Sequence, residues 1–112
     1  MGFFKYMFGD NRVLTAKDPA VQRELTYMND RYQAFIEEFP ASRRETVYFI
    51  RCTSKRLFSR LYRDGVIDGG SIRVPGKSKV YNTKADAFEG LMWLRCYLDD
   101  MELKQDIDDR FF

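Results

Sequence analysis

The fold of this chain depends most on its basic middle, residues 42–63, which reads SRRETVYFIRCTSKRLFSRLYR. Ser42 and Glu45 have the spacing of a capping box, which predicts that a helix begins here. Apolar residues follow at helical spacing, namely Val47, Ile50, Leu57, Phe58 and Leu61. Gly65 suits the end of such a helix. We therefore expect one long basic helix over residues 43–64.

A strand is the alternative for the first half of this stretch. Residues 46–50 are rich in β-branched and aromatic side chains, which favour strands. Such a strand would break near residues 52–54 and would leave only Lys55 to Arg63 helical. The agreement between the capping box and the apolar face favours the single helix.

Another helix is predicted before this stretch, over residues 18–39. Asp18 and Pro19 form an N-cap followed by proline at the first helical position. The apolar residues behind them are spaced alternately by four and three, namely Val21, Leu25, Met28, Tyr32, Phe35 and Phe39. Pro40 ends this pattern. We expect residues 1–17 to be an irregular leading segment.

A β-hairpin is predicted after the basic stretch, over residues 71–82. Pro75 and Gly76 lie between two β-prone runs, which is typical of a turn between paired strands. The turn also contains the Gly-Lys-Ser ending of a phosphate-binding P-loop. Ser71 stands where that motif requires glycine, so nucleoside triphosphate binding is not expected.

The third predicted helix covers residues 84–104. Thr83 and Asp86 form a second capping box at its start. Its apolar positions are spaced by four and three, namely Ala87, Leu91, Leu94, Leu98 and Met101. The acidic residues that follow would oppose the helix dipole, so residues 105–112 are expected to form an acidic tail.

Together these elements predict a mainly α protein of the α+β type, with three amphipathic helices packed as a small bundle and one β-hairpin between the second and third helices. A chain of 112 residues that is 45% hydrophobic fits a single domain, residues 1–112. Three large apolar residues fall outside the main stripes, namely Tyr27, Phe49 and Trp93. A homodimer, in which a second copy covers them, is therefore also an expectation.

Missing and rare residue types narrow the function. The chain has no histidine, the commonest general base and metal ligand, so we expect a protein that is not an enzyme and needs no metal or cofactor. Its two cysteines, Cys52 and Cys96, lack the spacing of a zinc site, and reduced thiols are typical of the cytoplasm. No apolar run reaches the roughly 18 residues of a membrane-spanning helix. A cytoplasmic protein is expected, in the host cytoplasm if the chain is viral.

Basic side chains are concentrated in the middle of the chain. Residues 43–84 hold eleven basic and three acidic side chains, a net charge of +8, whereas residues 85–112 hold three basic and eight acidic ones, a net charge of −5. Two basic stripes would run along the expected second helix, the first with Arg44, Arg51 and Lys55 and the second with Arg56, Arg60 and Arg63. The hairpin adds Arg73, Lys77 and Lys79.

Guanidinium and ammonium groups beside aromatic rings such as Tyr48 suit contact with phosphates and bases. The leading hypothesis is a small non-enzymatic nucleic-acid-binding or regulatory protein that contacts DNA or RNA through the second helix and the hairpin. Its candidate binding residues are Arg44, Tyr48, Arg51, Lys55, Arg56, Arg60, Arg63, Arg73, Lys77 and Lys79. A small capped chain of this kind is in keeping with a virus- or mobile-element-encoded protein.

Other interpretations stay open. The basic face could be a solvated helix surface that the acidic third helix partly neutralises. The chain could instead be a protein–protein interaction or inhibitor protein that binds and blocks a host or partner protein, or a small oligomeric structural subunit. The order of basic helix, glycine turn and hairpin resembles a winged-helix layout in outline, but the expected elements lack the helix-turn-helix of that family.

Overall fold

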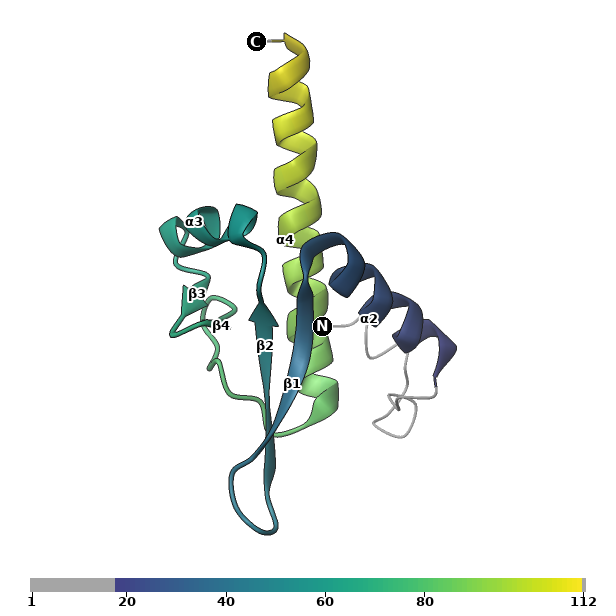
Figure 1. Cartoon of the computed structure of the whole chain (residues 1–112), viewed down its shortest axis with the longest axis vertical. Coiled ribbons are helices and arrows are strands. Elements are labelled where there is room, and N and C mark those ends of the chain that lie inside the picture. The colour runs from purple at the N-terminus through teal and green to yellow at the C-terminus, as the bar shows by residue number, and fades with distance from the viewer. Residues whose placement is uncertain (1–17, 112) are drawn as a thin grey trace.

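The computed structural model describes residues 18–111, which form three helices and a four-stranded antiparallel sheet (Figure 1). The elements in chain order are α2 (Pro19–Tyr32), β1 (Ala34–Pro40), β2 (Thr46–Cys52), α3 (Lys55–Arg63), β3 (Ile67–Asp68), β4 (Ser71–Ile72) and α4 (Lys84–Phe111). The predicted mainly α bundle is wrong, because the chain builds a sheet with the strand order β1-β2-β4-β3. The segment expected to be irregular, residues 1–17, lies outside the described residues.

The first predicted helix, over residues 18–39, is correct only in its first part. Asp18 caps α2 as expected, because its carboxylate accepts hydrogen bonds from two backbone N–H groups of the first turn, at 2.9 and 3.4 Å. α2 ends at Tyr32 because Gln33 adopts the left-handed conformation, with φ +53°, and its N–H bonds back to the last turn. Residues 34–40 are therefore free to form β1 rather than the end of a helix.

The continuous basic helix predicted over residues 43–64 is wrong, because its first half is the strand β2, which forms a long hairpin with β1. All seven residues of β1 lie opposite the seven residues of β2. Ser42 does not cap a helix, because its hydroxyl oxygen accepts a backbone N–H within the connecting loop. The carbonyl of Glu45 accepts the N–H of Ala41 at 3.0 Å and closes that loop. The strand alternative is confirmed, and α3 is the helical remainder.

The predicted hairpin over residues 71–82 is wrong in its pairing. β4 pairs with β3, which precedes it, through a turn at Gly69 and Gly70. Their φ angles are +60° and +85°, which a two-residue turn between twisted strands requires and which glycine adopts without steric cost. Pro75 and Gly76 do form a turn, but it lies in a loop and not between paired strands.

α4 is the predicted third helix and carries much of the core. Thr83 caps it as expected, with its hydroxyl oxygen accepting the backbone N–H of Asp86 at 3.1 Å. The helix continues to Phe111 through the stretch expected to be a tail. It crosses behind β1 and β2, and its C-terminal end stands clear of the other elements (Figure 1). Its predicted apolar positions are fully buried at Ala87, Leu91, Leu94 and Leu98.

Candidate functional site

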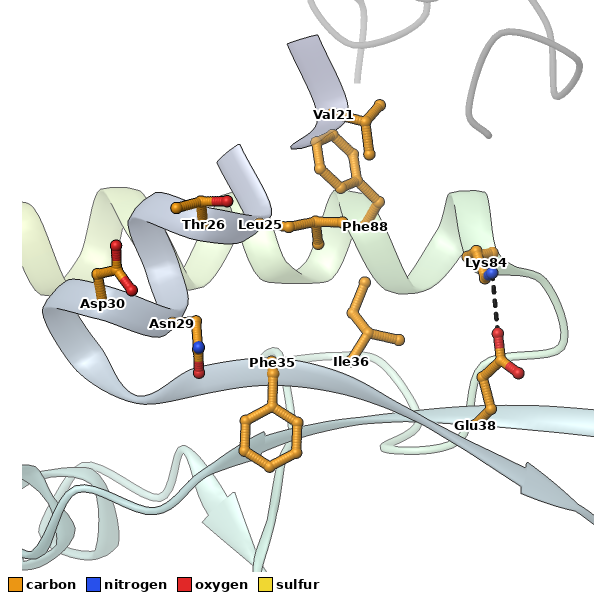
Figure 2. Close-up of a pocket in the computed structure, with 10 residues that line it drawn as sticks. All are labelled: Val21, Leu25, Thr26, Asn29, Asp30, Phe35, Ile36, Glu38, Lys84 and Phe88. Carbon is orange, nitrogen blue, oxygen red and sulfur yellow. Dashed lines mark ion pairs between the residues drawn. The ribbon is translucent and has the colours of Figure 1, made fainter. Parts of the chain in front are cut away.

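The two faces of the β1–β2 hairpin have different surroundings. Because side chains alternate along a strand, Ala34 and Ile36 on β1 and Ile50 on β2 share the face that joins the core with α2 and α4. Figure 2 shows the ring of Phe35 on the opposite side of β1 from Ile36. We call this opposite side the open face. It consists of Phe35, Glu37, Phe39, Val47, Phe49 and Arg51.

Three phenylalanines form a row on the open face. Phe39 is 53% exposed, and its ring meets that of Phe49 edge to face, with the ring centroids 6.2 Å apart. Phe49 lies opposite Glu37, so along the strand direction it stands between Phe35 and Phe39. Successive members of the row are therefore about 6.5 Å apart along the strands. The row ends at Arg51, which lies opposite Phe35.

Two separate segments of the chain pair with the same edge of β2. Arg51 lies opposite Ser71 of β4, and Tyr48 lies opposite Tyr81 in an isolated bridge. A step of three residues along β2 thus corresponds to a step of ten along its neighbour, so residues 73–80 must loop out beside β2. This segment, which we call the basic loop, carries Arg73, Lys77 and Lys79.

Two cationic groups converge on the turn between β3 and β4. A Cβ atom at Gly70 would lie 3.9 Å from the guanidinium carbon of Arg51, and one at Gly69 would lie 3.2 Å from Nζ of Lys79. A side chain at position 69 would thus crowd Lys79, whereas one at position 70 would be in ordinary contact with Arg51. Lys79 lies 3.8 Å from a carboxylate oxygen of Asp68, whereas Arg51 has no ion pair within the described part of the chain. One acid thus offsets only part of the charge at this turn.

Five other predicted residues are exposed and form no ion pair within the described residues. They are Arg44, Lys55, Arg63, Arg73 and Lys77. The first lies in the loop that joins β1 to β2, the next two are the first and last residues of α3, and the others lie in the basic loop. The first predicted stripe is therefore divided among a loop, a strand and the start of a helix, and does not follow one helical face.

The remaining predicted residues are engaged inside the molecule. Arg56 pairs with Glu102 of α4 at 2.8 Å, and Arg60 lies 3.4 Å from a carboxylate oxygen of Asp64. The acidic third helix thus offsets part of the charge of Arg56, as the solvated-face interpretation expected, although Arg31 pairs with the same carboxylate. Tyr48 is half-buried on the core side of β2, so its ring does not belong to the open face.

The row of phenylalanines was missed from the sequence. Phe35 and Phe39 are four residues apart, which also fits a helical stripe that continues from α2. Two signals favoured a strand: the run from residue 34 to residue 40 contains three β-prone apolar residues, and it ends in proline before a polar turn. Position 33 is glutamine and not glycine, so the usual sequence signal for the end of a helix was missing.

An apolar cavity of about 540 Å³ lies between α2, β1 and the start of α4. Figure 2 shows Val21 and Leu25 of α2, Ile36 of β1 and Phe88 of α4 around it. Lys84 and Glu38 form a 2.8 Å ion pair beside it, which joins α4 to β1 and raises the pKa of the lysine. The cavity lies on the core side of the sheet, and Phe35, whose ring is on the open face, is also among the residues that line it.

Asp99 of α4 is the centre of a polar cluster that holds α2. Tyr27 donates a hydrogen bond to it at 2.8 Å, and Tyr32 donates a second one. Burial and the neighbouring carboxylate raise the pKa of both phenols, so they remain protonated donors. Arg95 lies 3.4 Å from the same carboxylate and also pairs with Glu24. These contacts position α2 against α4.

Metal and membrane sites were also searched in the described residues. These residues contain no group of three or more histidine, cysteine, aspartate or glutamate side chains that could hold a metal ion. None of the described helices is long and apolar enough to cross a membrane. Cys52 and Cys96 are both free thiols, and burial raises the pKa of Cys52.

Comparison with protein-family models, with curated proteins and with solved structures finds no match for this chain. Its function must therefore be argued from the geometry and charge of its own surface.

Proposed function

We propose that this chain is a small, non-enzymatic protein that binds DNA or RNA through the phosphate backbone. The observation that carries the proposal is the convergence of the Arg51 guanidinium and the Lys79 ammonium at the Gly69–Gly70 turn. Both groups donate hydrogen bonds to phosphate oxygens, and a guanidinium can hold a phosphate with two parallel bonds. Within the described residues Arg51 has no acidic partner, so it can bind an external anion without breaking an ion pair, whereas Lys79 lies beside Asp68.

Exposed cations extend this site in several directions. Arg73 and Lys77 lie in the adjoining basic loop, and Lys55 starts α3 shortly after Arg51 in the chain. Arg44 lies beyond the far end of β2. At the rise of a β-strand, Arg44 and Arg51 are roughly 20 Å apart. A cationic surface of that length fits a polymer of phosphates better than one small anion.

The proposal is tested by fluorescence anisotropy with labelled DNA and RNA at several salt concentrations. We expect the logarithm of the binding constant to fall linearly with the logarithm of the salt concentration, because phosphate contacts release counterions. The double variant Arg51→Gln, Lys79→Gln should weaken binding to every sequence and reduce that slope by about 2.

A matched control carries the same change in net charge elsewhere. Arg23→Gln with Lys104→Gln removes two exposed cations that lie on α2 and α4, away from the turn. This control should keep the affinity and the salt slope of the unmodified protein. Equal losses in the two double variants, or no binding of DNA or RNA at low salt, would contradict the proposal.

A protein-binding function is the second candidate, and the apolar cavity between α2, β1 and α4 is the observation that favours it. A cavity lined by Val21, Leu25 and Phe88 can accept an apolar side chain of a partner. Purification of tagged protein from its native cells, with and without nuclease, separates the two functions. A partner protein that survives nuclease and is lost with Thr26→Phe, which would fill the cavity mouth, supports this second function.

A further inference from the structure

We infer that the preferred ligand is single-stranded nucleic acid, whose bases stack on Phe35, Phe49 and Phe39 while its phosphates meet the cations around the open face. This inference rests on the proposed function and specifies the form of nucleic acid that the surface accepts. It uses an observation on which that proposal does not depend, the row of aromatic rings on the open face, where Phe39 is exposed and Phe35 and Phe49 are half-buried.

The spacing of the row decides between paired and unpaired bases. Neighbouring phenylalanines are about 6.5 Å apart along the strands, about twice the 3.4 Å rise between bases of one strand in duplex DNA. Only an extended single strand can place successive bases at that spacing. A duplex in addition keeps the faces of its bases stacked on one another, so they are not available to a protein ring.

Charge complementarity supports the same occupant. Arg51 lies opposite Phe35 at one end of the row, and Arg44 lies in the loop beyond Phe39 at the other end. A single strand of nucleic acid that runs along the row of phenylalanines would therefore meet a cation at both ends of the row. One acid, Glu37, lies on the open face opposite Phe49, where it would repel a phosphate. Removing the charge of this acid should therefore raise the affinity for nucleic acid, which provides a test of the inference.

The test compares a labelled oligo(dT), an oligo(U) and a duplex of matched length by anisotropy with the full-length protein. The single strands should bind more tightly than the duplex. Phe39→Ala should weaken single-strand binding by about fivefold or more, since stacking of one base on an aromatic ring contributes that much. Glu37→Gln should tighten it, a result that damage to the fold cannot produce.

Phe58 provides a matched control, because it is the same residue type at 50% exposure against 53% for Phe39, and it stacks on Tyr62 of α3, outside the open face. Phe58→Ala should leave single-strand affinity unchanged, and circular dichroism should confirm that both alanine variants are folded.

Three other results would contradict the inference, and each would have a different meaning. Equal affinity for duplex and single strands, with no effect of Phe39→Ala or Glu37→Gln, would leave phosphate binding standing and remove base stacking. The absence of all nucleic-acid binding would remove both proposals. Self-association that Phe39→Ala abolishes, without nucleic-acid binding, would show that a second copy of the chain covers the open face.

Discussion

At the scale of single residues, Gly90 and Tyr81 set how closely α4 approaches the sheet. A Cβ atom on Gly90 would collide with the Tyr81 hydroxyl and would lie 2.8 Å from Cδ1 of Ile50. Glycine inside a helix costs about 0.5–1 kcal/mol relative to alanine, so this close contact explains its presence. The Tyr81 hydroxyl is buried and has no hydrogen-bond partner within the described part of the chain. The close fit between Gly90 and Tyr81 therefore comes from their shapes and not from a hydrogen bond of the hydroxyl.

Gly90→Ala should destabilise the protein by about 1–3 kcal/mol, because the added methyl overpacks the core. Urea denaturation followed by circular dichroism measures this loss. The double variant Gly90→Ala, Tyr81→Phe should recover part of it, since the phenylalanine removes the oxygen that meets the methyl. Tyr81→Phe alone should not destabilise the protein, because it removes a buried hydroxyl that has no partner. A double variant that is no more stable than Gly90→Ala would show that the clash lies elsewhere.

At the scale of elements, Gln33 separates a helix from a strand. Its left-handed backbone, at φ +53°, ends α2 and turns the chain into β1, and its carbonyl accepts the backbone N–H of Thr53 at 3.0 Å. Any residue with a Cβ atom is strained in this conformation, and glycine is not. The boundary between the helix and the strand thus depends on contacts on both sides of Gln33 that outweigh the strain.

Gln33→Gly should raise the free energy of unfolding by about 1 kcal/mol, because it relieves this strain at an exposed position. Thermal and urea denaturation both measure the change. Gln33→Ala is the control: it removes the same side chain and keeps the Cβ atom, so it should not stabilise. Equal stability of the two variants would mean that the left-handed conformation carries no strain here.

At the scale of the whole molecule, α4 joins the other helices through polar contacts as well as through the core. Asp99 and Glu102 of α4 bind side chains of α2, and Glu102 also binds Arg56 of α3. Tyr97 of α4 donates a hydrogen bond to Asp64, just after α3. This bond, with a smaller effect of Arg60, holds the pKa of the Asp64 carboxyl below its usual range. Burial of the Tyr97 phenol, together with its hydrogen bond to Asp64, raises the pKa of Tyr97 to about 12.

Asp64 should therefore make stability depend on pH on the acid side. A carboxyl with a lowered pKa in the folded state stabilises fully above its ordinary value of about 3.9, and this contribution disappears as the pH falls through the lowered pKa. Asp64→Asn should lower stability at neutral pH and flatten its fall below about pH 4 in urea denaturation. Asp30→Asn is the control, since Asp30 is exposed without an ion pair in the described residues. Parallel pH profiles for Asp64→Asn and the unmodified protein would refute this role.

Local chemistry by itself determined where α2 and α4 begin and where α3 ends. Asp18 and Thr83 form their capping hydrogen bonds with residues two or three positions away, and Gly65 adopts its positive φ at the end of α3. The apolar spacing of α4 likewise describes one face of one helix. Such features involve neighbours in the chain, so the sequence predicts them correctly.

Only the tertiary structure decided the conformation of residues 34–52 and the surface that results. The spacing of Phe35 and Phe39 fits a helix and a strand equally, and the strand forms because its backbone pairs with β2 while Ile36 and Ile50 are buried on the core side. Contacts between distant residues also determine which cationic side chains remain available to a ligand. Arg56 shares an acid on α4 with Arg31, whereas Arg51, beside Gly70, has no ion pair within the described residues. Pairings between distant residues have no local signature, which is why the basic middle was predicted as one helix and is instead the strand β2 followed by α3.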